Sequence, residues 1–182
     1  ETARFLPELP KRRSFHVAIN VAASHFHDRE IIDDLHRLWW PAQPKPQLIV
    51  ELTERDSLPV VDQRVVSHLH SAGVKLAIDD FGTGHSSLSY LKTLNPDILK
   101  IDKTFTAAIG TDAINATVID MVISLAQRLD ISLVAEGVET AEQAAYLSER
   151  GVDSLQGYFY ARPMPLEDFP AWLTAHRALP QQ

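Results

Sequence analysis

The stretch "KLAIDDFGTGHSS" covers residues 75–87 and joins a short apolar run to a loop rich in glycine and hydroxyl groups. Residues 75–79 are predicted to form a buried strand, and Asp79 and Asp80 stand side by side where that strand ends. A single acid after a strand is most often a helix cap or a solvated loop residue. Taken alone, this pair fits a structural role and a functional role equally well, so the rest of the chain has to decide between them.

Outward from this stretch, apolar β-type runs alternate with helical patterns along most of the chain. We predict strands over residues 15–20, 47–54, 75–79, 97–102, 131–136 and 154–159, and helices over 28–40, around 61–69 with Gly73 closing it, 86–94, 112–129, 141–150 and after Pro165. The near-continuous apolar strands favour a parallel sheet covered on both sides by helices. No linker or low-complexity tract divides the chain, so residues 1–182 are predicted to form a single domain.

Two of the predicted helices carry patterns that a structure can check. The long helix 112–129 has one apolar stripe, which consists of Ile114, Val118, Met121, Leu125 and Leu129. Thr140 and Gln143 form a capping-box pattern at the start of helix 141–150, and Gly151 follows its end. Trp39 and Trp40 are expected to anchor their helix on the fold rather than to stack on a base.

The composition excludes several classes of protein. Of 182 residues, 45% are hydrophobic and 23% are charged, as in ordinary globular chains. The formal net charge of −7 makes duplex nucleic acid a poor partner, because duplexes reward basic surfaces. The absence of cysteine excludes disulfides and thiolate metal sites and fits a reducing compartment. No apolar run is long enough to cross a membrane, which needs about 18 residues or more.

Polar side chains gather at the predicted carboxyl ends of the strands. In chain order they are Asn20, Glu51, Glu54, Asp79, Asp80, Lys100, Asp102, Glu136, Glu139 and Gln156. In a parallel α/β fold these ends lie on one side, and in a barrel they surround one mouth. So many carboxylates repel each other unless cations neutralise them, and one lysine is too little. Oxygen ligands favour Mg²⁺ or Mn²⁺ over Ca²⁺, and two adjacent aspartates can serve two cations, as in phosphoryl chemistry.

Five motifs, in this order and spacing, closely resemble the EAL-domain family. They are "ELTE" (51–54), "DDFGTGHSS" (79–87), "LKID" (99–102), "AEGVET" (135–140) and "QGYF" (156–159). The resemblance covers the chain from about Phe15 to Pro165. Proteins of this family are bacterial phosphodiesterases that adopt a modified TIM barrel. The resemblance therefore implies hydrolysis of the second messenger cyclic di-GMP to linear pGpG by a mechanism with two Mg²⁺ or Mn²⁺ ions.

The resemblance also implies roles for individual residues. Metal ligation falls on Asn20, Glu51, Asp79, Asp80 and Asp102. Lys100 would hold and polarise the attacking water, and Glu136 would act beside it as a metal ligand or as a general base.

Further positions of the family pattern concern the substrate and the rim of the barrel. Gln156 would line the site for substrate and water. Glu54 and Glu139 would steady the loop Phe81–Ser87, which the family uses to couple metal binding to dimerisation, so a homodimer through this loop is expected. His85 departs from the tyrosine that is common in the family, which would alter the packing of the loop.

A larger departure concerns the beginning of the barrel. The Glu-Ala-Leu stretch that names the family lies on its first strand, and this stretch, with its metal-ligating glutamate, is not in the sequence. A TIM barrel typically has roughly 250 residues, so the chain corresponds to the C-terminal portion, about three quarters of a barrel. We expect a fragment of a complete cytoplasmic domain, with a sensory domain upstream and an inner-membrane anchor in the full-length protein. The alternative is a truncated chain that is inactive.

Two other functions remain as alternatives. A non-catalytic EAL-type domain would bind cyclic di-GMP or a protein partner as a sensor, but every later ligand position from Asn20 onward is occupied, which favours the enzyme. A lyase or aldolase would use Lys100 as a Schiff-base amine. Such an amine needs a lowered pKa, whereas carboxylates around Lys100 would raise it.

Overall fold

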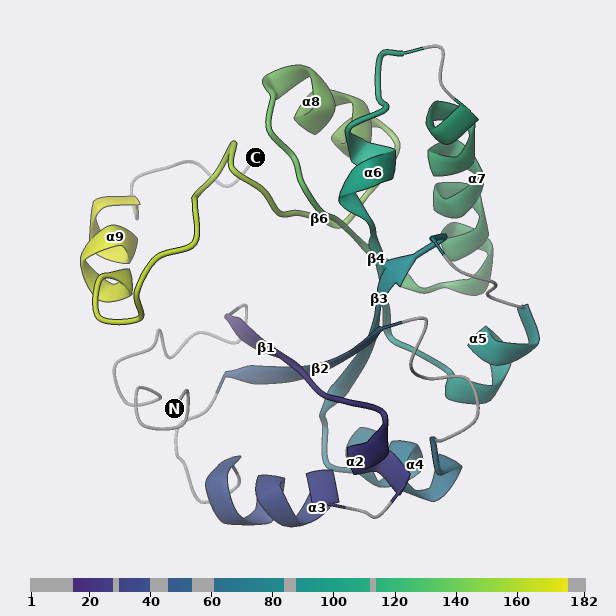
Figure 1. Ribbon diagram of the computed structural model, residues 1–182, viewed down its shortest axis with the longest axis vertical. Helices are drawn as coiled ribbons and strands as arrows, with labels where there is room; N and C mark the ends of the chain where they lie inside the picture. Colours follow the sequence, from purple (N-terminus) through teal and green to yellow (C-terminus); the bar gives the residue numbers. More distant parts are fainter. Residues whose placement is uncertain are drawn as a thin grey trace.

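The computed structural model describes residues 15–27, 30–39, 46–53, 61–83, 88–111 and 114–176, and Figure 1 shows their arrangement. One parallel sheet contains, in chain order and in spatial order, β1 (His16–Asn20), β2 (Gln47–Thr53), β3 (Lys75–Phe81), β4 (Ile98–Ile101), β5 (Ser132–Ala135) and β6 (Ser154–Leu155). The sheet curls into an open half-barrel with helices around its outer side (Figure 1). The predicted parallel α/β architecture is therefore confirmed. The expected helical cover on both faces is wrong for the described residues, because the sheet curls and its helices lie on the outer side (Figure 1).

The helices lie between and after the strands. They are α2 (Ser24–His27), α3 (Glu30–Asp34), α4 (Gln63–Ser71), α5 (Leu88–Leu94), α6 (Lys103–Thr106), α7 (Ile114–Leu129), α8 (Ala141–Glu149) and α9 (Phe169–His176). The predicted capping box is present, because Thr140 Oγ1 accepts from the Gln143 amide at 3.2 Å and Gln143 Oε1 accepts from the Thr140 amide at 3.1 Å. None of the described helices is long and apolar enough to cross a membrane.

Both faces of the central strands are buried, which explains their continuous apolar sequences. Side chains such as Leu76, Ile78 and Leu99 contribute to the large core. A small second core consists of Ile49, Ala77 and Ile98, with Val134 packed against it. The period of two along a strand places these residues on the opposite face of the sheet, which is the inner face of the half-barrel.

Two aspartates tie neighbouring strands together at their amino ends. Asp97, just before β4, accepts a hydrogen bond from the backbone amide of Leu76 in β3 at 2.9 Å. Asp153, just before β6, accepts one from Leu133 in β5 at 2.7 Å. Each carboxylate therefore binds the backbone of the preceding strand and sets where the next strand starts relative to it.

The last strand is much shorter than predicted. The sequence suggested a strand over residues 154–159, but pairing ends at Leu155. The cause is a close backbone approach at Gly157, where an added Cβ would lie 2.1 Å from the carbonyl oxygen of Val138. The same carbonyl accepts from the Phe159 amide at 3.0 Å. The chain therefore turns here instead of continuing along β5, and the aromatic side chains 158–160 are exposed.

The apolar stripe predicted for α7 is correct only in part, since Val118 and Leu125 pack against the core but Met121 and Leu129 do not. The side chains buried against the core are Ile119, Val122, Ile123 and Ala126. Met121 is 66% exposed and Leu129 is 37% exposed, while Val118 and Leu125 are half-buried. The helix has apolar residues on two faces, and helical spacing alone cannot tell which face meets the sheet. Ile114 is in the helix, but its side chain lies outside the described residues.

The helix predicted over 28–40 is present over residues 30–39, but its winding changes part-way along. After α3, residues Leu35–Trp39 form a π-helical turn, and the extra residue per turn changes which side chains face the core. Trp39 is buried in the core, as expected of an anchor. Residues 28, 29 and Trp40 lie outside the described residues.

Thr106 provides a test of this packing. Its hydroxyl is fully buried at the end of α6 and has no hydrogen-bond partner among the described residues. Because an unpaired buried polar group is costly, we expect Thr106→Val to raise the free energy of unfolding by about 1 kcal/mol, measured by urea denaturation. Thr111→Val is the control, because the Thr111 hydroxyl donates to the Ala108 carbonyl at 2.7 Å. A destabilised Thr106→Val protein would contradict this account.

Candidate metal centre at the carboxyl ends of the strands

The inner face of the half-barrel changes from apolar to charged in one step along the strands. Side chains two residues apart on a strand share a face. The inner apolar layer consists of Ile49, Ala77, Ile98 and Val134. The residues two positions further along are Glu51, Asp79, Lys100 and Glu136. The strand period therefore stacks a charged layer on the apolar layer, at the carboxyl ends of β2 to β5.

Lys100 lies at the centre of the charged layer and is only 5% exposed. Its Nζ lies 2.8 Å from Glu51 Oε2, 3.0 Å from Asp79 Oδ1 and 2.7 Å from Glu136 Oε1. The carboxylates come from β2, from β3 and from the residue after β5. One ammonium on β4 therefore joins four neighbouring segments of the sheet.

The electrostatics keep this lysine charged. Burial alone would lower the pKa of Lys100, but hydrogen bonds to Glu136 and Glu51 outweigh it and raise this pKa far above its usual range. Burial raises the pKa of Glu136; the Lys100 ammonium opposes this, and the nearby carboxylates add to it. Three carboxylates share one ammonium, so negative charge remains to be neutralised.

Asp79 and Asp80 lie inside β3, not after its end as the sequence suggested. Neighbouring side chains on a regular strand point to opposite faces, so two adjacent aspartates could not reach one site. The pairing of β3 with β4 shifts register between Ile78 and Phe81, and Asp80 has a φ of 55°. This bulge, at a residue type that tolerates the left-handed region, brings both carboxylates to the same side.

Asp80 and Asp102 form the second part of the acidic cluster. Burial raises the pKa of Asp80, and the charges of Asp79 and Asp102 add to this. Asp102 is the N-cap of α6, and its Oδ1 accepts from the Thr104 amide at 2.9 Å and from the Thr104 hydroxyl. Burial alone would raise the pKa of Asp102, but the bonds from Thr104 lower it overall. Asp102 therefore stays ionised beside Asp80.

The donor set fits a divalent cation. Asp79, Asp80 and Glu136 each offer one oxygen, and these oxygens lie within 4.8 Å of one another. The donors are hard carboxylate oxygens, which suit Mg²⁺ or Mn²⁺. A bound cation would also supply the positive charge that Lys100 alone does not.

A model of the EAL domain family matches residues 1–163. The chain belongs to the EAL domain family. It is 59% identical over 180 residues to "Probable cyclic di-GMP phosphodiesterase PdeD" of Escherichia coli, a match that covers 99% of this chain and 34% of PdeD. The chain thus spans about a third of the length of that relative.

Solved structures of EAL domains match the fold. The EAL domain of Mycobacterium smegmatis DcpA has a TM-score of 0.78 and 32% identity, over 96% of this chain and 77% of that one. Klebsiella pneumoniae BlrP1, in complex with manganese and cyclic di-GMP, has a TM-score of 0.71 and 32% identity, over 81% of this chain and 39% of that one. EAL domains have a TIM-barrel-like fold, so the expected fold class is confirmed.

The structure does not bring all the residues of the EAL motifs into contact with the cluster. Asn20 ends β1, is exposed, and pairs with Glu51 in the register of β1 and β2. Glu139 and Gln156 are exposed residues that follow β5 and β6. Glu54 and residues 84–87, which include His85, lie outside the described residues.

Sequence reasoning missed Thr104, which holds one oxygen of Asp102 and leaves the other for the site. A signal was present, because aspartate is a favoured N-cap residue whose side chain accepts from a backbone amide two or three residues later, here that of Thr104. The signal is weak because α6 has only 4 residues, too few to show the apolar periodicity by which a helix is predicted.

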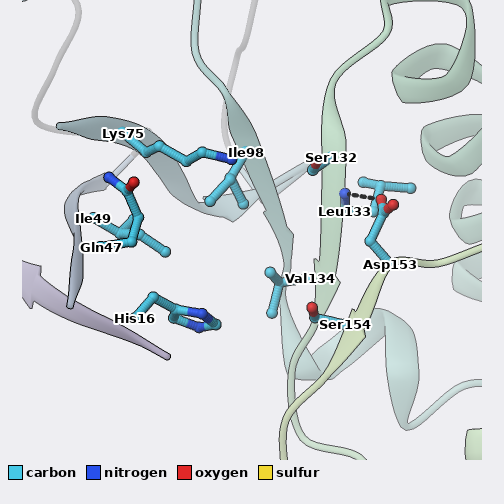
Figure 2. Close-up of a pocket in the computed structure, with 10 residues that line it drawn as sticks. All are labelled: His16, Gln47, Ile49, Lys75, Ile98, Ser132, Leu133, Val134, Asp153 and Ser154. Carbon is cyan, nitrogen blue, oxygen red and sulfur yellow. Dashed lines mark hydrogen bonds between the residues drawn. The ribbon is translucent and has the colours of Figure 1, made fainter. Parts of the chain in front are cut away.

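The EAL domain also has a cavity at the opposite ends of the strands, shown in Figure 2. It has a volume of about 260 Å³ and is open to solvent. It is lined by His16, Gln47, Ile49, Lys75, Ile98, Ser132, Leu133, Val134, Asp153 and Ser154. Most of these residues start a strand, and three of them, Ile49, Ile98 and Val134, belong to the inner apolar layer. The acidic cluster lies on the far side of that layer. The cavity therefore does not belong to the candidate metal centre.

The raised pKa of Asp80 leads to a prediction about stability in the absence of metal. An acid whose pKa is raised by folding ionises at a cost, so stability falls as pH rises from the unfolded pKa through the folded pKa. We expect Asp80→Asn to stabilise the domain at pH 7, and the gain to vanish below about pH 4, where Asp80 is protonated in both states.

Thermal unfolding in chelator between pH 4 and pH 7 measures this effect. Asp130→Asn is the matched control, because Asp130 is exposed and also has a positive φ, of 56°. It reports any gain that comes from an amide in left-handed backbone. A gain that is equal in the two variants, or that does not change with pH, would rule out the electrostatic explanation.

Proposed function

We propose that this EAL domain hydrolyses cyclic di-GMP to linear pGpG with two Mg²⁺ or Mn²⁺ ions. The observation that carries the proposal is the excess of carboxylates around one buried ammonium at the carboxyl ends of the strands. The names of the relatives, which include cyclic di-GMP phosphodiesterases, support the choice of substrate.

The metal ligands in this proposal are Asn20, Glu51, Asp79, Asp80 and Asp102. Bound cations would supply Lewis acidity, lowering the pKa of a water and balancing charge on the phosphate. The bulge in β3 supports a role for both aspartates, because it directs them to one side. The ionised Asp102, with one oxygen held by Thr104, keeps the other oxygen available as a ligand.

Lys100 and Glu136 are assigned to the reaction itself. Because the pKa of Lys100 is raised, its ammonium donates hydrogen bonds and orients the attacking water without giving up a proton. The raised pKa of Glu136 fits a carboxylate that accepts a proton from that water. The charged state of Lys100 also argues against a Schiff-base lyase, which requires a neutral amine.

Two further roles lie at the rim of the barrel. Gln156 would contact the substrate. Glu54 and Glu139 would steady the loop Phe81–Ser87. Thr83, at the described start of that loop, donates from its hydroxyl to the Asp80 carbonyl at 2.9 Å. The loop is thus attached directly to a proposed ligand, which supports its use as a homodimer contact that responds to metal.

The direct test is incubation of the intact protein with cyclic di-GMP and Mg²⁺, with and without chelator, followed by chromatography. Linear pGpG should form only with free metal. Binding of cyclic di-GMP without any product would favour the non-catalytic sensor instead.

Replacing the lysine separates chemistry from metal binding. We expect Lys100→Ala to lower kcat by about 10²-fold or more, since it removes the group that orients the water. Calorimetric affinity for Mg²⁺ should be largely retained. Lys75→Ala is the control, because Lys75 lies at the opposite end of the neighbouring strand and is exposed. Unchanged turnover by Lys100→Ala would remove its assigned role.

A further inference from the structure

The loop that carries Glu136 into the site is held on both sides. On one side, the Val138 amide donates to the Gln156 carbonyl at 3.0 Å. On the other side, Gly137 packs directly on α6, where an added Cβ would lie 2.5 Å from Lys103 Cβ, and its φ is 66°. The loop between β5 and α8 is therefore packed between the segment after β6 and helix α6, and at Gly137 it is too close to α6 to accept a larger side chain.

One side chain outside the site fastens this loop to α6. Gln143 Oε1 accepts from the amides of Glu139 at 2.8 Å and Thr140 at 3.1 Å, and these bonds cap α8. Gln143 Nε2 donates to the Thr106 carbonyl, the last residue of α6, at 3.2 Å. Capping needs only the acceptor half of the amide. The donor half is therefore used for a contact between elements.

This contact matters because α6 starts at a proposed metal ligand. Asp102 is the N-cap of α6, and the helix has 4 residues, too few to be stable without its neighbours. The Glu136 amide donates to the Ile101 carbonyl at 3.0 Å, so the pairing of β4 with β5 fixes the two backbones relative to each other. The direction of the Asp102 carboxylate depends in addition on α6, because its Oδ1 accepts from the Thr104 amide in that helix. Gln143 joins the far end of that helix to the loop that carries Glu136.

We propose that Gln143 is a positioning residue that holds α6 in place and thereby sets the orientation of the Asp102 carboxylate relative to Glu136 across the metal centre. This inference rests on the proposed function, in which Asp102 binds metal and Glu136 acts on the water beside it. Groups that hold metal ligands in place typically contribute 10–100-fold to metal affinity or activity.

The test uses Gln143→Glu in the intact protein. Glutamate keeps the acceptor that caps α8 and loses the donor that binds Thr106. The added negative charge by itself favours a cation, so a weaker metal affinity could not be caused by charge. Thr140→Ala is the matched control, because it removes the other capping bond, from the Gln143 amide to Thr140 Oγ1, and leaves the contact with α6 intact.

Calorimetric titration with Mn²⁺, thermal unfolding in chelator and hydrolysis of cyclic di-GMP are measured on all three proteins. We expect Gln143→Glu to bind Mn²⁺ about tenfold more weakly, with a lower kcat and little change in KM, while its Tm stays near that of the unaltered protein. Thr140→Ala should lower the Tm and leave the Mn²⁺ affinity unchanged.

Three outcomes would overturn the inference. Unchanged Mn²⁺ affinity in Gln143→Glu would show that the contact does not position the ligands. Equal losses in Gln143→Glu and Thr140→Ala would assign the effect to the cap of α8. Failure of the unaltered protein to bind Mn²⁺ would overturn the proposed function and this inference with it. This outcome is distinguishable from failure of the inference alone, because it is seen in the unaltered protein and not only in the Gln143→Glu variant.

Discussion

The buried ammonium of Lys100 is the interaction on which the rest of the site depends. A charge that leaves water must be paired, and Lys100 is paired with three carboxylates from different segments. No one segment could satisfy it, so β2, β3, β4 and the end of β5 have to meet before the charge is stable in the fold. The same arrangement leaves a surplus of negative charge, which is the property that makes the mouth suitable for divalent cations. The same excess of carboxylates over ammonium groups thus pairs the buried lysine and attracts cations.

Much of this could be predicted from the sequence, because the strand period and the direction of parallel strands decide which end of each strand carries its polar residue. The acids at positions 51, 79, 80, 102 and 136 stood out for that reason. The capping box of α8 was predicted from its own local pattern, a threonine followed three residues later by a glutamine. The bulge at Asp79 and Asp80 could not be predicted, since it depends on how β3 pairs with β4. The buried face of α7 depends on the helix's contact with the sheet, and the early end of β6 depends on the backbone of Val138 meeting Gly157. These three misses concern contacts between segments far apart in the chain, about which the local pattern has no information.

The two ends of the strands have different tasks. At the carboxyl ends, side chains are charged, close together and connected to loops, one of which Gln143 bonds to α6. At the amino ends, the side chains around the cavity of Figure 2 start the strands and tie them to their neighbours. This division is usual for barrels, in which one end carries chemistry and the other carries stability.

The aspartates before β4 and β6 have an effect that reaches beyond the bonds they make. If β4 slid by one residue along β3, Asp97 would lose the Leu76 amide, and every side chain of β4 would change faces. Lys100 would then point into the apolar outer core, and one of its neighbours in β4, Leu99 or Ile101, would face the acids instead. A misaligned sheet would thus lose stability at both ends of β4. At the amino end it would lose the hydrogen bond between Asp97 and Leu76, and at the carboxyl end it would leave the Lys100 ammonium buried without its carboxylates. The carboxylate of Asp97, at the other end of β4 from the acidic cluster, therefore helps to keep Lys100 on the inner face of the sheet.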